Sequence, residues 1–122
     1  IVETGEKIFK HFLVNQEEPN FTIKKYKNCL VFSLMPQQTK AAIWYYTREL
    51  YFGNISLNEE GRVERNGNGA EWVQGRHFYQ GQFISGQKNG RGKISYQNGD
   101  EYEGQWLEGQ IYGFGRFTDS KK

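Results

Sequence analysis

The sequence has few of the residues that build crosslinks and metal sites. Its 122 residues include one cysteine, two histidines and two prolines. The single cysteine, Cys29, excludes a disulfide within the chain, and its apolar neighbours predict a small buried side chain in a reducing compartment. His11 and His77 belong to no cysteine or histidine cluster of zinc spacing, so no metal site is predicted.

The sequence also lacks a strong charge and a long apolar run. Sixteen basic and fourteen acidic residues give a net charge of +2, without the basic face that duplex nucleic acid requires, so no nucleic-acid partner is predicted. No stretch reaches 18 apolar residues, and no signal-peptide pattern is present. We expect an intracellular protein, cytoplasmic or cytoskeletal, with a cilium as one setting.

Catalytic motifs are missing as well. The stretch from Gly86 to Lys93 resembles a phosphate-binding loop, but five residues separate Gly86 from Gly92 instead of four, and Ile94 stands where Ser or Thr is needed. No nucleophile, base and orienting acid occur in a recognisable pattern. The sequence therefore predicts no catalytic residue, no cofactor and no enzymatic activity.

Glycine is scarce in the first part of the chain and abundant in the rest. Of 15 glycines, only Gly5 precedes Gly53, and aromatic residues make up 16% of the whole. This shift in composition predicts a boundary near residue 50 and a core rich in rings after it.

A pattern of aromatic residues and glycines repeats after the boundary. Positions in the stretch 79–92 recur 23 residues later with the same residue types. The matched positions are Tyr79, Gly81, Phe83, Gly86, Gly90 and Gly92, followed by Tyr102, Gly104, Trp106, Gly109, Gly113 and Gly115. A period of about 20–50 residues indicates stacked supersecondary units.

Each unit is predicted to be an antiparallel β-hairpin. Residues two apart share a face of a strand, so the rings and glycines lie on one face and Gln80, Gln82, Glu103 and Gln105 on the other, which we interpret as solvated. We predict turns at 85–89 and 108–112, and Asn98-Gly99 predicts the link between units. Several glycines in a strand indicate that something packs closely over them, and we expect the rings of one hairpin to cover the glycines of its neighbour.

These residues resemble the MORN repeat (membrane occupation and recognition nexus), with the pattern Y-x-G-x-W-x-x-G-x-x-x-G-x-G. Residues 102–119 match all of it, and residues 79–101 match with Phe83 in place of the tryptophan. A degenerate unit covers residues 51–78, with Tyr51, Gly53, Ile55, Gly67 and Gly69 at the expected places and a longer turn between Ser56 and Val63. Residues 120–122 form a short tail.

Residues 1–50 show no family pattern and are predicted to cap the repeat array. Apolar residues at helical spacing favour a short amphipathic helix within Glu6 to Asn15. Strands are predicted around Phe21 and Ile23, at Cys29 to Leu34 and at Ala41 to Tyr46, with a turn within Lys24 to Asn28. The expected fold is therefore mainly β, a twisted, elongated stack of antiparallel hairpins with a mixed N-terminal capping segment.

The resemblance implies a function in binding. Our first hypothesis is a protein–protein interaction module that acts as a scaffold or structural subunit of a multi-subunit complex, with Tyr79, Phe83, Tyr102 and Trp106 as partner-binding candidates beside their core role. The alternative is weak binding to acidic phospholipid through Lys88, Arg91, Lys93 and Arg116. Because such repeats also accompany lysine-methyltransferase and lipid-kinase domains, an accessory role in a larger enzyme is a third hypothesis.

Overall fold

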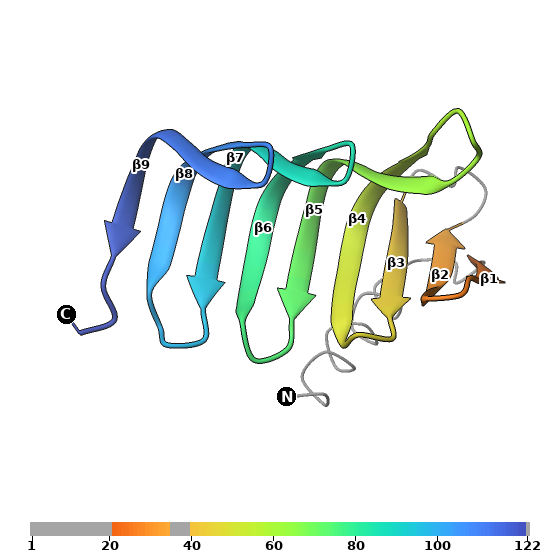
Figure 1. Cartoon of the computed structure of the whole chain (residues 1–122), viewed down its shortest axis with the longest axis horizontal. Helices are drawn as coiled ribbons and strands as arrows, with labels where there is room; N and C mark the ends of the chain where they lie inside the picture. Colours follow the sequence, from red (N-terminus) through yellow and green to blue (C-terminus); the bar gives the residue numbers. More distant parts are fainter. Residues whose placement is uncertain (1–20, 35–39, 122) are drawn as a thin grey trace.

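The computed structural model describes residues 21–34 and 40–121, and all its regular elements in these ranges are β-strands. The nine strands are β1 (Phe21–Lys25), β2 (Cys29–Leu34), β3 (Lys40–Tyr45), β4 (Glu49–Leu57), β5 (Val63–Val73), β6 (His77–Ile84), β7 (Gln87–Tyr96), β8 (Glu101–Leu107) and β9 (Gln110–Thr118). Each strand pairs with the next in antiparallel fashion, and the sheet order equals the chain order (Figure 1). This open sheet confirms the predicted fold of stacked antiparallel hairpins.

The N-terminal strands belong to the same sheet as the repeats. β1, β2 and β3 form where alternating and apolar residues predicted strands, and β3 pairs with β4 so that Ile43 lies opposite Tyr51. The predicted helix within Glu6 to Asn15 lies outside the described residues. The role of residues 1–50 as a cap stays a prediction.

The hairpin turns are shorter than predicted. Ser85 and Gly86 alone connect β6 to β7, and Glu108 and Gly109 alone connect β8 to β9, so residues 87–89 and 110–112 already lie in strands. Both residues of each turn have positive φ, at 48° and 85° in the first and 49° and 83° in the second. This is the type I′ conformation, whose twist matches that of the flanking strands. The two-residue turn requires positive φ at Ser85 and Glu108, which such residues rarely adopt, so the residue types alone do not indicate it.

Each repeat hairpin contains an irregularity next to a glycine. The register of the pairing shifts between Gly53 and Ile55, between Gly81 and Phe83, and between Gly104 and Trp106. Such β-bulges bend a strand and increase its twist. In Figure 1, β7 and β9 accordingly turn sharply along their length, so the hairpin tips run across the ends of their neighbours.

Glycines occupy one continuous row across the sheet. Gly53, Gly69, Gly81, Gly92, Gly104 and Gly115 lie opposite one another on successive strands. The next row on the same face holds Tyr51, Tyr79, Ile94 and Tyr102, all buried. Together with Phe83 and Trp106, these side chains form most of the core, which lies on this side of the sheet.

Buried residues also occur on the opposite side, over part of the sheet. Ala42, Leu50 and Ala70 are buried there, on β3, β4 and β5. Across β7 to β9 the same side carries Lys93, Glu103 and Arg116 instead. The sheet thus changes from apolar to charged along this side.

Candidate interaction surfaces

Five aromatic rings form a continuous stack, which we call the ring stack: Tyr51, Phe83, Tyr79, Trp106 and Tyr102. Each ring meets the next edge to face, with centroids 5.2 Å apart for Tyr51 and Phe83 and for Phe83 and Tyr79, 5.3 Å for Tyr79 and Trp106, and 5.5 Å for Trp106 and Tyr102. This edge-to-face arrangement is favourable beyond the apolar area that it buries. The stack therefore ties the three hairpins into one body.

The tyrosines of the ring stack lie over glycines of their own hairpin. A Cβ added to Gly81 or Gly92 would collide with the side chain of Tyr79, whose hydroxyl donates to the Gln82 carbonyl at 3.0 Å. The expectation that rings cover a neighbouring hairpin is thus wrong for the tyrosines. The other two rings do reach the neighbouring hairpin: Phe83 lies opposite Gly67 and contacts the Tyr51 ring, and Trp106 donates from Nε1 to the Gly92 carbonyl at 3.0 Å.

The third hairpin repeats this geometry. A Cβ on Gly104 or Gly115 would collide with the side chain of Tyr102, and the Tyr102 hydroxyl donates to the Gln105 carbonyl at 3.1 Å. The turns repeat their contacts too, since Gly86 N–H donates to the Arg65 carbonyl and Gly109 N–H to the Lys88 carbonyl, both at 2.9 Å. The two hairpins are therefore built and joined in the same way.

A family model for the MORN repeat matches residues 79–101 and 102–121. The chain carries two MORN repeats. The MORN repeat is a non-catalytic module that generally binds proteins or membranes. A comparison with curated proteins gives no match.

The hairpin before the matched repeats has the same internal geometry. The Tyr51 hydroxyl donates to the Asn54 carbonyl at 2.6 Å, and a Cβ on Gly69 would collide with the Tyr51 ring. Ile55, buried, takes the place of the MORN tryptophan. Residues 58–62 form the longer loop, closed by two backbone amides that donate to the Asn58 side chain at 2.9 Å.

The four rings predicted to bind a partner are buried. Tyr79 is 0% exposed and Trp106 is 5% exposed, and Phe83 and Tyr102 are also in the core. The structure brings the four together as part of the ring stack. Within the part of the chain that the structure describes, these four rings hold the hairpins together. Their contact with a partner stays a prediction.

Two of the glutamines interpreted as solvated have a defined structural role. The Gln82 Oε1 accepts from Arg91 N–H at 2.7 Å, and the Gln105 Oε1 accepts from Phe114 N–H at 3.0 Å. Each bond spans the β-bulge of its own hairpin and pairs a backbone donor. The 23-residue spacing of the two glutamines is the signal that could have revealed this role.

A buried charge cluster between the first two hairpins was missed by sequence reasoning. The Glu71 carboxylate contacts Arg65 Nη1 at 2.6 Å, His77 Nε2 at 2.7 Å and Lys88 Nζ at 2.9 Å. Arg65 also reaches Glu49 at 3.2 Å. Glu71 stands at the repeat position that Ile94 and then Phe117 occupy in the MORN repeats. A charged residue at a position that is otherwise apolar is the signal that could have revealed the cluster.

The cluster shifts the pKa values of its members. Burial raises the pKa of Glu71, but hydrogen bonds and charge from His77, Lys88 and Arg65 outweigh it and hold this pKa at about 2. Burial lowers the pKa of Arg65, yet the neighbouring Tyr45 and Glu71 raise it above its usual range. Both groups are therefore charged at neutral pH, which the short distances between them require.

Aromatic rings surround the Arg65 guanidinium. Its carbon lies 4.8 Å from the centroid of Tyr51, 5.1 Å from Tyr45 and 5.7 Å from Phe83. Cation–π contacts of this kind are strongest when they are desolvated. The Arg65 side chain therefore connects the charge cluster to the ring stack.

The basic residues of the phospholipid hypothesis do not form one patch. Lys88 lies on the side of the ring stack, with its Nζ 5.5 Å from the Tyr79 centroid, and is paired with Glu71. Arg91, Lys93 and Arg116 lie on the opposite side, because they pair in register with Gln105 and Glu103 there. No helix in residues 21–34 and 40–121 is long and apolar enough to cross a membrane.

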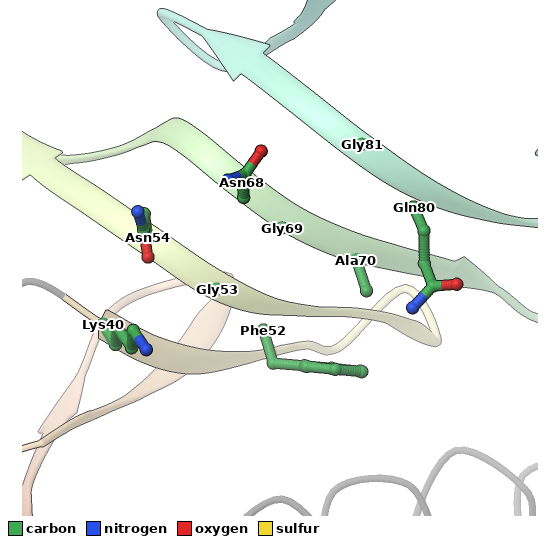
Figure 2. Close-up of a pocket in the computed structure, with 9 residues that line it drawn as sticks. All are labelled: Lys40, Phe52, Gly53, Asn54, Asn68, Gly69, Ala70, Gln80 and Gly81. Carbon is green, nitrogen blue, oxygen red and sulfur yellow. The ribbon is translucent and has the colours of Figure 1, made fainter. Parts of the chain in front are cut away.

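The side opposite the ring stack is hollowed along the glycine row. Figure 2 shows Gly53, Gly69 and Gly81 in line along the floor of this hollow. The hollow encloses about 580 Å³, lies open to solvent and is edged by Lys40, Phe52, Asn54, Asn68, Ala70 and Gln80. Its edges are amides, apolar groups and the Lys40 side chain, which can hydrogen-bond and pack against a polypeptide.

A second hollow lies beside β1 to β3 on the side of the ring stack. It encloses about 730 Å³ and is lined mainly by apolar and aromatic groups, with Arg62 at its edge. Its lining includes Tyr26, Cys29, Val31, Ile43, Tyr45 and Val63. Cys29 is a free thiol here, and burial raises its pKa, as expected for a structural rather than a reactive cysteine.

The last strand, β9, presents large apolar side chains to solvent. Phe114 is 86% exposed and Phe117 is 60% exposed, and Ile111 and Tyr112 are exposed beside them. In the preceding repeat, Ile94 at the position of Phe117 is only 3% exposed, because β8 lies against β7. β9 has no strand on its outer side within the described residues.

Proposed function

We propose that this chain is a non-enzymatic protein-interaction module that acts as a scaffold or structural subunit of a larger assembly. The observation that carries the proposal is β9, which has no neighbouring strand on its outer side within the described residues and exposes Phe114 and Phe117. An unpaired strand edge offers a row of backbone donors and acceptors to another polypeptide. Exposed rings next to it supply anchoring area.

The packing of the rest of the chain supports the same proposal. The ring stack and the Glu71 cluster hold the three hairpins in fixed relation, so β9 is displayed on a preorganised support. Preorganisation lowers the entropy that binding costs. An intracellular setting, in a cilium or the cytoskeleton, is proposed from the family resemblance alone.

Binding to a protein is favoured over binding to acidic phospholipid by the placement of the basic residues. Arg91, Lys93 and Arg116 share their side of the sheet with Glu101 and Glu103, and Lys93 lies 3.7 Å from Glu101. Nearby carboxylates oppose the attraction of an anionic surface, which amounts to roughly 1 kcal/mol per basic residue.

Affinity purification from the native cells, followed by mass spectrometry, tests the proposal. We expect the tagged chain to retain a fixed set of proteins in near-stoichiometric amounts at moderate salt, and the Phe114→Asp/Phe117→Asp variant to lose them. Ile84→Asp is the control, since Ile84 is also an exposed apolar residue but lies on β6, away from β9. Recovery of the chain only with membranes, in a salt-sensitive manner, would contradict the proposal.

A further inference from the structure

Apolar side chains occupy the side opposite the ring stack on β2, β3, β4 and β5. They form two rows across the strands, because the members of each row pair in register. One row is Leu30, Trp44, Leu50 and Trp72, and the other is Phe32, Ala42, Phe52 and Ala70. We call these eight residues the apolar face.

The apolar face is more buried than one sheet layer explains. Ala42 is 0% exposed and Leu50 is 2% exposed, and the four large rings of the face are half-buried. Phe114 lies on the same side of β9 and is 86% exposed. The regular elements in residues 21–34 and 40–121 are strands of one sheet, so none of them lies over this face. The burial therefore indicates a cover from outside the described residues.

The sequence before β1 contains a segment with the matching pattern. Four apolar residues recur at helical spacing within residues 6–15, with Lys10 and His11 between them, and they are Ile8, Phe9, Phe12 and Leu13. A helix of this length is about 15 Å long. The apolar face spans about 14 Å from β2 to β5, since neighbouring strands lie about 4.8 Å apart. The segment and the face therefore match in length and in polarity.

The connection between the segment and the face is short. Residues 16–20 join the segment to Phe21, where β1 begins. These residues reach about 17 Å when extended, and β1 pairs with β2, which carries Leu30 and Phe32. A segment tethered this closely has a high effective concentration at the face, which favours it over a separate chain.

We propose that residues 6–15 bind the apolar face as an amphipathic helix, with their four apolar side chains against its rings. Ala42 lies between Phe32 and Phe52 in its row, which leaves room for a side chain of the helix. This inference goes beyond the proposed function, because it concerns the other side of the sheet and the strands most distant from β9. With the apolar face occupied from within the chain, β9 is left to receive a partner.

Crosslinking in the 122-residue chain tests where the segment lies. All variants carry Cys29→Ala, so that the introduced thiols are the only ones. In dilute solution, Phe12→Cys/Phe52→Cys should form an intramolecular crosslink with a short bismaleimide in high yield. Phe12→Cys/Glu103→Cys is the matched control and should form only traces, since Glu103 lies on the same side of the sheet but on β8, beyond the apolar face.

Tryptophan fluorescence supplies a second readout. Trp44 and Trp72 belong to the apolar face and Trp106 to the ring stack, so a Trp106→Phe background reports on the face alone. In this background, Phe9→Asp/Phe12→Asp should shift the emission to longer wavelength, because the cover of both rings is lost. Lys10→Asp/His11→Asp, which adds the same carboxylates to the polar side of the segment, should leave the emission unchanged.

Three results would overturn the proposal. They are a crosslink to Phe52→Cys no stronger than the one to Glu103→Cys, unchanged emission of Phe9→Asp/Phe12→Asp, and a crosslinked dimer in place of the intramolecular product, which would show that a second copy covers the face. If circular dichroism shows that Phe9→Asp/Phe12→Asp loses the sheet, the crosslinks decide, since they need no charge in the segment. Neither readout involves β9, so the purification tests the proposed function separately.

Discussion

Replacing Glu71 with glutamine should destabilise the chain strongly at neutral pH. The carboxylate contacts three basic side chains at 2.6 to 2.9 Å in a site where Arg65 is 10% and Lys88 is 16% exposed. Glutamine keeps the size of the side chain and one acceptor oxygen, but it removes the negative charge beside Arg65 and Lys88. Glu49 is then the carboxylate that still contacts Arg65. A buried cation that has lost its counter-charge lowers the stability of the folded chain. Because glutamine and glutamate have nearly the same shape, the variant tests the charge and not the packing.

The size of the effect follows from the pKa of Glu71. This pKa is lowered from 4.5 to about 2 in the folded chain, and such a difference corresponds to about 3 kcal/mol of stability. Because the folded pKa is the lower one, the contribution is fully present above pH 4.5 and is lost as the pH falls toward 2.

Urea unfolding followed by tryptophan fluorescence, at pH values from neutral to acid, measures this contribution. At pH 7 the free energy of unfolding of the wild-type chain should exceed that of Glu71→Gln by about 3 kcal/mol. The gap should narrow below pH 4.5 and nearly vanish by pH 2. Glu103→Gln, at an exposed position, should cost no more than about 1 kcal/mol at any pH. A gap for Glu71→Gln that is small, or independent of pH, would refute the reasoning.

Three further substitutions test the hairpins. Trp106→Ala should lower the free energy of unfolding by about 3 kcal/mol or more, because a buried ring is lost; an unchanged urea midpoint would show that the ring contributes little to the core. Gly104→Val should disrupt the sheet, since a Cβ at this position meets the Gly115 backbone. Gly61→Asn should be tolerated, because a Cβ there meets no other atom. A native circular dichroism spectrum for the valine variant would contradict the close packing at Gly104. Glu108→Asn should raise stability by about 1 kcal/mol, because asparagine accommodates the positive φ of 49° better, and a lower melting temperature would argue against strain at this turn.

The sequence predicted the hairpins well because period and alternation are local properties. The 23-residue spacing placed Gly67 and Gly69 in the first hairpin from Gly90 and Gly92, and all four lie in the expected strands. Gly67 and Gly90 both have positive φ, at 100° and 88°. Glycine is the residue that adopts this conformation without strain, so its spacing carries structural information directly.

The turn lengths and the contacts of the rings were predicted less well, since each depends on atoms distant in the sequence. Ser85 adopts positive φ in a two-residue turn whose Gly86 N–H donates to the Arg65 carbonyl on β5. Tyr79 lies over its own hairpin because the bulge after Gly81 brings the Gln82 carbonyl within reach of the hydroxyl. Neither contact can be derived from alternation alone.

The sequence by itself determined the repeat, the strand class and the face that carries the rings, because a period of two residues assigns side chains to faces and a fixed offset assigns them to units. Tertiary structure alone decided what those rings do. It buried Tyr79, Phe83, Tyr102 and Trp106 between hairpins, and it gathered Arg65, Glu71, His77 and Lys88 from three strands into one charge cluster. It also left β9 without a neighbour in the described residues, since exposure depends on which strand lies alongside and not on the residue itself.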